Sequence, residues 1–106
     1  MKLKHEHIRE LVNRVVSSVA PLRIILFGSA VRGRMRMNSD LDILVIVADG
    51  IHRRQAVQSI YRGLTGFGIA TDVIVATLDD IKKYGNNYSL IYRSALLDGR
   101  EIYHAA

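Results

Sequence analysis

The sequence contains no cysteine, no tryptophan and a single proline. Without cysteine, the chain can form neither a disulfide framework nor a cysteine-based zinc site, and nothing in it indicates an oxidising compartment. Its histidines are scattered along the chain, which is more typical of surface residues than of a metal site. No apolar run approaches the roughly 18 residues that a membrane span requires. We therefore expect a cytoplasmic protein that does not interact with a membrane.

The remaining composition is that of an ordinary globular protein. The chain has 106 residues, of which 49% are hydrophobic and 24% are charged, and it has no internal repeat. This length predicts a single domain spanning residues 1–106. A net charge of +5 suits an anionic partner such as a nucleotide, a nucleic acid or an acidic protein face, without choosing among them.

A short apolar segment, Arg23 to Phe27, reads as a buried strand and ends at Gly28-Ser29. Ser29 is placed to cap a short helix that continues through Arg32. The unpaired N–H groups at a helix N-terminus attract anions, so a phosphate group could bind at Ser29. The alternative, that this is an ordinary turn with a serine cap, stays open because the motif is short.

Two carboxylates begin the next apolar segment, which runs from about Asp40 to Val47. Side chains alternate between the two faces of a strand, so Asp40 and Asp42 project from the same face together with Leu44 and Ile46. On a helix the same spacing would turn the two carboxylates far apart. The strand-like context therefore makes them a candidate pair.

A third acid, Asp72, lies in the middle of a predicted strand from Ile69 to Ala76. The helix predicted for Ile51 to Leu64 suits a crossover, which would make this strand parallel to the preceding one and place Asp72 beside Asp42. If Gly28-Ser29 and Asp40 serve one site, the first two strands run antiparallel. Because an unpaired buried acid is costly, Asp72 should have a partner.

The other segments complete a small mixed β-sheet flanked by helices, an α/β (α+β) fold. We expect an amphipathic helix from about Lys4 to Val19, a capping box at Thr77 to Asp80, and a last helix that ends at Gly99. Residues 101–103 could add an edge strand. Five residues of the crossover helix should face the core: Ala56, Val57, Ile60, Tyr61 and Leu64.

Three carboxylates within a few ångströms would repel one another by about 4 kcal/mol for each pair 4 Å apart at an effective dielectric near 20. Magnesium is a hard cation that prefers oxygen ligands and is often held by one or two carboxylates together with substrate phosphates. Two such ions would suit phosphoryl or nucleotidyl transfer. The acids Asp40, Asp42 and Asp72 therefore predict a magnesium site.

Gly28-Ser29, ten intervening residues and Asp40-Leu41-Asp42 resemble the signature of the DNA polymerase beta-like nucleotidyltransferase superfamily. With Arg32-Gly33 and the short chain, the pattern most resembles the minimal nucleotidyltransferases, small prokaryotic proteins usually encoded beside a HEPN-domain partner.

The resemblance implies a role for each motif residue. Gly28 and Ser29 would hold the triphosphate of ATP or another nucleoside triphosphate, and Arg32 matches a recurrent arginine of the motif. Asp40 and Asp42 would bind Mg²⁺. The third acid, Asp72, would join the catalytic metal and help to deprotonate the attacking hydroxyl. The family also implies an antitoxin that acts on a HEPN ribonuclease, in some cases by transferring AMP to one of its tyrosines.

The loop between the two motifs departs from the family pattern, because Arg34 and Arg36 stand where acidic or neutral residues are expected. This departure concerns the substrate and the partner more than the metal site. Two alternatives to transfer onto a protein stay open. One is a non-catalytic module that neutralises its partner by occlusion. The other is nucleic-acid binding or nucleotide transfer to RNA, suggested by the net charge and by Arg34, Arg36, Arg53 and Arg54.

Overall fold

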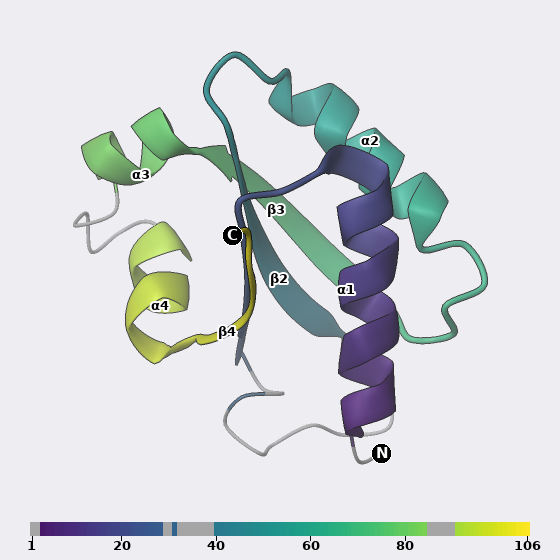
Figure 1. The fold of residues 1–106 in the computed structure, drawn as a ribbon. Helices are drawn as coiled ribbons and strands as arrows, with labels where there is room; N and C mark the ends of the chain where they lie inside the picture. Colours follow the sequence, from purple (N-terminus) through teal and green to yellow (C-terminus); the bar gives the residue numbers. More distant parts are fainter. Residues whose placement is uncertain (1–2, 29–30, 32–39, 85–90) are drawn as a thin grey trace.

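The computed structural model describes residues 3–28, 31, 40–84 and 91–106. A four-stranded sheet in the order β3-β2-β1-β4 forms its centre. Helices cover both faces of this sheet (Figure 1). The elements along the chain are α1 (His5–Val19), β1 (Arg23–Phe27), β2 (Leu41–Val47), α2 (Arg53–Gly63), β3 (Thr71–Thr77), α3 (Leu78–Tyr84), α4 (Ile91–Asp98) and β4 (Arg100–His104).

Both predicted strand directions are confirmed. β1 pairs with β2 antiparallel, and β2 pairs with β3 parallel. The parallel pair requires a crossover, which α2 supplies. β4 adds to the other side of β1 as an antiparallel edge strand with an irregularity between Ile24 and Ile25. The chain therefore has the mixed sheet with flanking helices that the sequence predicts.

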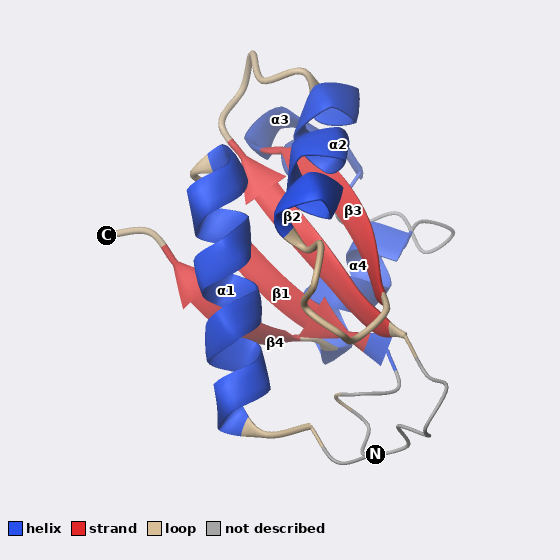
Figure 2. Ribbon diagram, turned by 90° about the vertical axis from the view of Figure 1, so that its right-hand side faces the viewer, coloured by secondary structure: helices blue, strands red, loops and turns tan. Residues whose placement is uncertain are grey.

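The two faces of the sheet bury two apolar clusters. α1 and α2 lie over one face, and α3 and α4 lie over the other (Figure 2). The larger cluster joins Leu11 and Val15 of α1 and Ile60 of α2 to alternate residues of the strands. The smaller cluster, which lies under α3 and α4, consists of Ile25, Phe27, Leu44, Ile46, Ala76 and Ala95. Each fully buried aliphatic side chain contributes roughly 1.5–3 kcal/mol, so both faces stabilise the fold.

Arg14 joins α1 to the end of α2. Its Nη1 donates hydrogen bonds to the carbonyl oxygens of Gly63 at 3.0 Å and Thr65 at 2.8 Å. Its guanidinium also lies 5.9 Å from the centre of the Phe67 ring. A cation beside the carbonyl groups at a helix C-terminus is favourable, because those groups carry partial negative charge. These contacts fix the end of the crossover helix against α1.

Two predictions about the crossover helix are wrong. α2 begins at Arg53 and not at Ile51, because the Nδ1 atom of His52 accepts a hydrogen bond from the N–H of Gln55 and caps the helix. Tyr61 is exposed (44%) and does not face the core. Its hydroxyl oxygen accepts a hydrogen bond from the backbone N–H of Val73 at 3.0 Å. The tyrosine thus satisfies a donor of β3, which lies at an edge of the sheet.

The burial expected for Asp72 is wrong, whereas the expectation that it has a partner stays a prediction. β3 is an edge strand, and Asp72, its second residue, is exposed. It forms no ion pair with any residue that the structure describes. The capping box after β3 is confirmed, since Thr77 and Asp80 exchange hydrogen bonds at the start of α3. In the described part of the chain, no helix has the length and apolar character needed to cross a bilayer.

Candidate functional site

The candidate site lies where β1 ends and β2 and β3 begin. β1 runs into Gly28, and antiparallel pairing aligns its last residue, Phe27, with Asp42. Parallel pairing on the other side aligns Asp42 with Asp72. The backbone N–H of Leu41 donates to the carbonyl oxygen of Ala70 at 2.8 Å, which fixes the start of β2 against the start of β3. The two acids are therefore direct neighbours across the parallel pair.

Both acids project from the face of the sheet that α3 and α4 cover. Alternation along β2 places Asp42 on the same face as Leu44, and alternation along β3 places Asp72 with Ala76. Leu44 and Ala76 belong to the smaller apolar cluster. Asp42 is half-buried, whereas Asp72 is exposed. The predicted arrangement of this pair is confirmed.

Asp40 immediately precedes β2 and is exposed. Partial burial raises the pKa of the Asp42 carboxyl above its usual value, and the negative charges of Asp72 and Asp40 raise it further. A carboxylate becomes harder to ionise when it loses water or when another negative charge lies close to it. The carboxyl of Asp42 thus lies within electrostatic reach of both other acids.

Gly28 lies against the carboxylate of Asp42. Its φ angle is 77°, which favours glycine over all other residues. A Cβ atom at this position would collide with Oδ2 of Asp42. The glycine thus allows the chain to turn and leaves room for the central carboxylate. Sequence reasoning assigned Gly28 only to phosphate binding, because contacts between side chains and backbone of different strands leave no pattern in the sequence.

The chemistry of this site suits a hard divalent cation. Its donors are carboxylate oxygens, the ligands that magnesium prefers. A bound cation would also relieve the repulsion between the carboxylates. Within the described residues, no group of three acidic or histidine side chains is arranged to hold a metal ion by itself. An ion at Asp42 and Asp72 would therefore complete its ligand shell with phosphate oxygens or water.

Ser29 and Arg32, the other predicted nucleotide-binding residues, lie outside the described residues, and so do Arg34 and Arg36 of the basic loop. The predicted site is thus described at Gly28 and at its three acids.

Residues 8–100 match the sequence profile of the nucleotidyltransferase domain. The chain belongs to this family. The matched range includes every predicted site residue, from Gly28 to Asp72. The chain is a nucleotidyltransferase, as the Gly-Ser and Asp-x-Asp motifs indicate.

Solved structures support the same fold. A toxin–antitoxin complex with AMP-PNP shares 20% sequence identity with a TM-score of 0.60, covering 92% of this chain and 73% of that one. The complex of tri-AMPylated Shewanella oneidensis HEPN toxin with MNT antitoxin shares 17% identity with a TM-score of 0.57, covering 97% and 74%. A putative nucleotidyltransferase from Sulfolobus solfataricus shares 26% identity with a TM-score of 0.55, covering 74% and 70%. The search of curated proteins found no match to this chain.

Proposed function

We propose that this nucleotidyltransferase uses Mg²⁺ to transfer a nucleoside monophosphate, AMP from ATP in the first instance, onto a hydroxyl group of a partner protein. The partner would be a HEPN-domain toxin, and the domain would act as its antitoxin. The observation that carries the proposal is the register pairing of Asp42 with Asp72, next to a glycine whose missing side chain makes room for Asp42.

The positions of the three acids suit them to different roles. Asp42, which is half-buried and close to both other acids, is the best placed to hold a cation, with Asp40 beside it. When bound, magnesium would neutralise these carboxylates and polarise the phosphate oxygens of the nucleotide. Gly28 and Ser29 would receive the triphosphate at the end of β1, with Arg32 as a further contact.

Asp72 is the exposed member of the pair, so an acceptor from another protein can reach it. The acceptor hydroxyl oxygen would form a bond to the α-phosphorus, and the bond from that phosphorus to the oxygen bridging to the β-phosphate would break. Pyrophosphate leaves, and the Asp72 carboxylate takes the proton of the hydroxyl. This assignment uses Asp72 as a base because it forms no ion pair with any described residue.

The similar structures support the choice of partner and nucleotide. One of them is a toxin–antitoxin complex with AMP-PNP, and another contains a tri-AMPylated HEPN toxin with its MNT antitoxin. The similarity spans more than nine-tenths of this chain in both cases. These similarities support a protein as the acceptor that we propose for this chain.

The test is a transfer assay with ATP labelled at the α-phosphate, Mg²⁺ and the protein encoded next to this chain. The wild type should label the partner, and Asp42→Asn should reduce the rate by roughly a hundredfold or more, because the site loses several kcal/mol of charge stabilisation. Asp79→Asn is the matched control, since it neutralises an exposed aspartate at the far end of β3. It should retain the wild-type rate.

Partner binding is measured in parallel by size-exclusion chromatography. If Asp42→Asn still binds and neutralises the toxin without transferring label, the domain acts by occlusion and the catalytic proposal is wrong. If label appears on RNA and not on protein, the proposed acceptor is wrong while the transferase activity stands.

A further inference from the structure

The outward side of α2 carries arginine, glutamine and tyrosine but no acid. Four exposed residues form what we call the α2 stripe: Arg54, Gln58, Tyr61 and Arg62. At 100° per residue they fall within about 100° of the helix circumference, so they share one side. The sequence contains no aspartate or glutamate anywhere from Gly50 to Thr71. The stripe is therefore a basic surface without acidic residues of its own.

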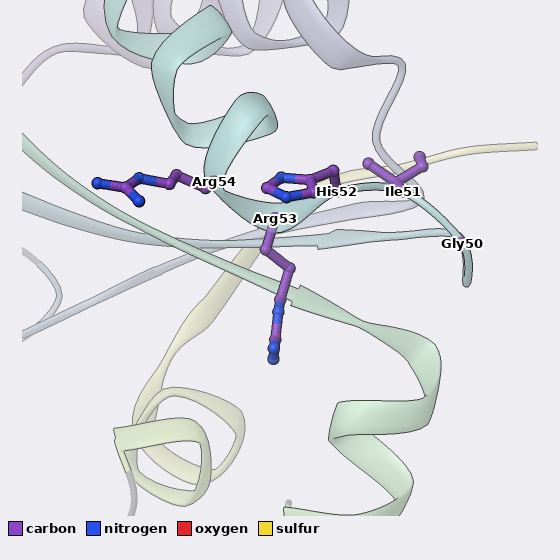
Figure 3. Close-up of a pocket in the computed structure, with 5 residues that line it drawn as sticks. All are labelled: Gly50, Ile51, His52, Arg53 and Arg54. Carbon is purple, nitrogen blue, oxygen red and sulfur yellow. The ribbon is translucent and has the colours of Figure 1, made fainter.

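The arginines of α2 differ in their partners. Arg53 turns toward α3, where its Nη1 lies 2.9 Å from Oδ2 of Asp80, whereas Arg54 points in another direction (Figure 3). Arg62 Nη2 donates to the hydroxyl of Ser59 on the same helix at 3.2 Å. Among the residues that the structure describes, neither Arg54 nor Arg62 forms an ion pair with a carboxylate. Asp80 thus compensates part of the charge of Arg53, and no carboxylate in the described part of the chain does so for the stripe arginines.

Tyr61 directly precedes Arg62 in the α2 stripe and is 44% exposed. The N–H of Val73 donates to its hydroxyl oxygen at 3.0 Å, which ties the end of the ring to β3. A ring that is held in place but remains open to solvent loses little conformational entropy when a flat group stacks on it. The ring is therefore suited to stack against a planar ligand.

A hollow of about 540 Å³ continues the stripe at the start of the helix. Its lining residues are Gly50, Ile51, His52, Arg53 and Arg54 (Figure 3). Arg54 belongs to both the hollow and the stripe, so a bound chain could extend from one to the other. The rise of 1.5 Å per residue puts the Cα atoms of Arg54 and Arg62 about 12 Å apart along the helix.

We propose that the α2 stripe binds single-stranded nucleic acid, with Arg54 and Arg62 on the phosphates and a base stacked on Tyr61. Aromatic rings combined with basic groups are the usual platform for single strands, because every base has a face that can stack. An acidic protein surface would pair with the arginines, but it offers no row of planar bases to stack on the ring. The stripe lies on the helix-covered face opposite to Asp42 and Asp72, so binding there is separate from the proposed transfer.

The test measures fluorescence anisotropy of a labelled, unstructured RNA of about 12 nucleotides at several salt concentrations. We expect Arg54→Gln/Arg62→Gln to weaken binding about tenfold at low salt. It should also reduce the slope of log K against log salt by about 1.4, or 0.7 for each lost phosphate contact. Tyr61→Ala should weaken binding about tenfold through lost stacking, whereas Tyr61→Phe should lose much less, because it keeps the ring and removes only the contact with Val73.

Lys82→Gln/Lys83→Gln is the matched control, because it removes the same charge from α3 on the other face of the sheet. It should leave RNA binding unchanged. Equal losses in the control and in the stripe variant would overturn the proposal, since the effect would then come from net charge alone. Equal affinity of Tyr61→Ala and the wild type would also overturn it, as would competition by poly-glutamate as effective as that of unlabelled RNA.

Discussion

The pKa values of aspartates at the two ends of the central sheet are shifted in opposite directions. At the end that carries the candidate site, Asp40, Asp42 and Asp72 lie near one another, and burial and mutual repulsion raise the pKa of Asp42. At the other end, burial of Asp80 is outweighed by the N–H of Thr77 and by Arg53, which together lower the pKa of its carboxyl. The same residue type is thus destabilised as an anion at one end and stabilised at the other.

Partners account for this difference. Asp49 accepts a hydrogen bond from the N–H of Asp79, and the side chain of Asp79 lies 3.0 Å from Nζ of Lys83. Asp80 has both a backbone donor and an arginine. These acids hold loops and helix ends in place. Asp40, Asp42 and Asp72 repel one another and do not stabilise the fold in this way. A cluster of acids that destabilises the fold is a physical sign of a ligand site.

Replacing Gly28 should have the largest effect on stability and should also disturb the acidic end. Gly28→Ala combines a left-handed backbone, which costs about 1–2 kcal/mol, with a collision against Asp42, which adds roughly 1–3 kcal/mol of overpacking. Urea denaturation measures the loss. Gly50→Ala is the matched control, since Gly50 also has a positive φ angle, of 91°, but has nothing near its missing Cβ.

Gly50→Ala should therefore lose only the backbone term. If the two variants were equally stable, Gly28 would not pack against Asp42 in solution. A double variant, Gly28→Ala/Asp42→Gly, should regain most of the additional loss, because it removes the colliding carboxylate.

Neutralising one aspartate at each end should shift stability in opposite directions. Asp80→Asn should lower the free energy of unfolding by roughly 0.5–1 kcal/mol at neutral pH, because it loses charge-assisted hydrogen bonds. Asp42→Asn should leave the protein without ligands as stable as the wild type or more stable, because it removes a repelling charge. Urea denaturation of the two variants measures both changes.

The pH dependence sharpens the contrast. The folded-state pKa of Asp80 lies below its ordinary value of 3.8, so its contribution is complete above that value and is lost as the pH falls through the lowered pKa. The folded-state pKa of Asp42 is raised above 3.8, so its penalty is absent below 3.8 and develops as the pH rises through the raised pKa. Both variants should approach wild-type stability in acid. Curves that ran parallel to the wild type at all pH values would contradict the two assignments.

Much of the fold could be predicted because periodicity and spacing are local signals. The bounds of β1 are the predicted ones, and the crossover length correctly indicated a parallel pair. The position of a strand within the sheet is not a local property. The apolar strand predicts burial for Asp72, but β3 lies at the edge of the sheet and its second residue is exposed to water.

The candidate site was predictable as a set of residues but not as a set of contacts. Strand alternation and parallel pairing were sufficient to place Asp42 beside Asp72. The contact of Gly28 with the Asp42 carboxylate depends on how two antiparallel strands meet, and no residue pattern encodes it. Tyr61 had helical spacing typical of the core, yet its hydroxyl reaches the open edge of β3 instead. Spacing indicates which side of a helix a residue occupies, but not whether the sheet under the helix extends far enough to bury it.

The most direct test of the central claim, that the acidic end holds magnesium together with a nucleotide, is thermal unfolding with each ligand alone and with both. A ligand at a hundred times its dissociation constant stabilises the folded state by about 2.7 kcal/mol, which corresponds to a Tm shift on the order of 10 °C. With Mg²⁺ and a non-hydrolysable ATP analogue together, the wild type and Asp79→Asn should shift by more than the sum of the separate shifts. Asp42→Asn should lose this synergy while remaining folded. A full synergistic shift in Asp42→Asn would show that Asp42 is not a metal ligand and would contradict the account.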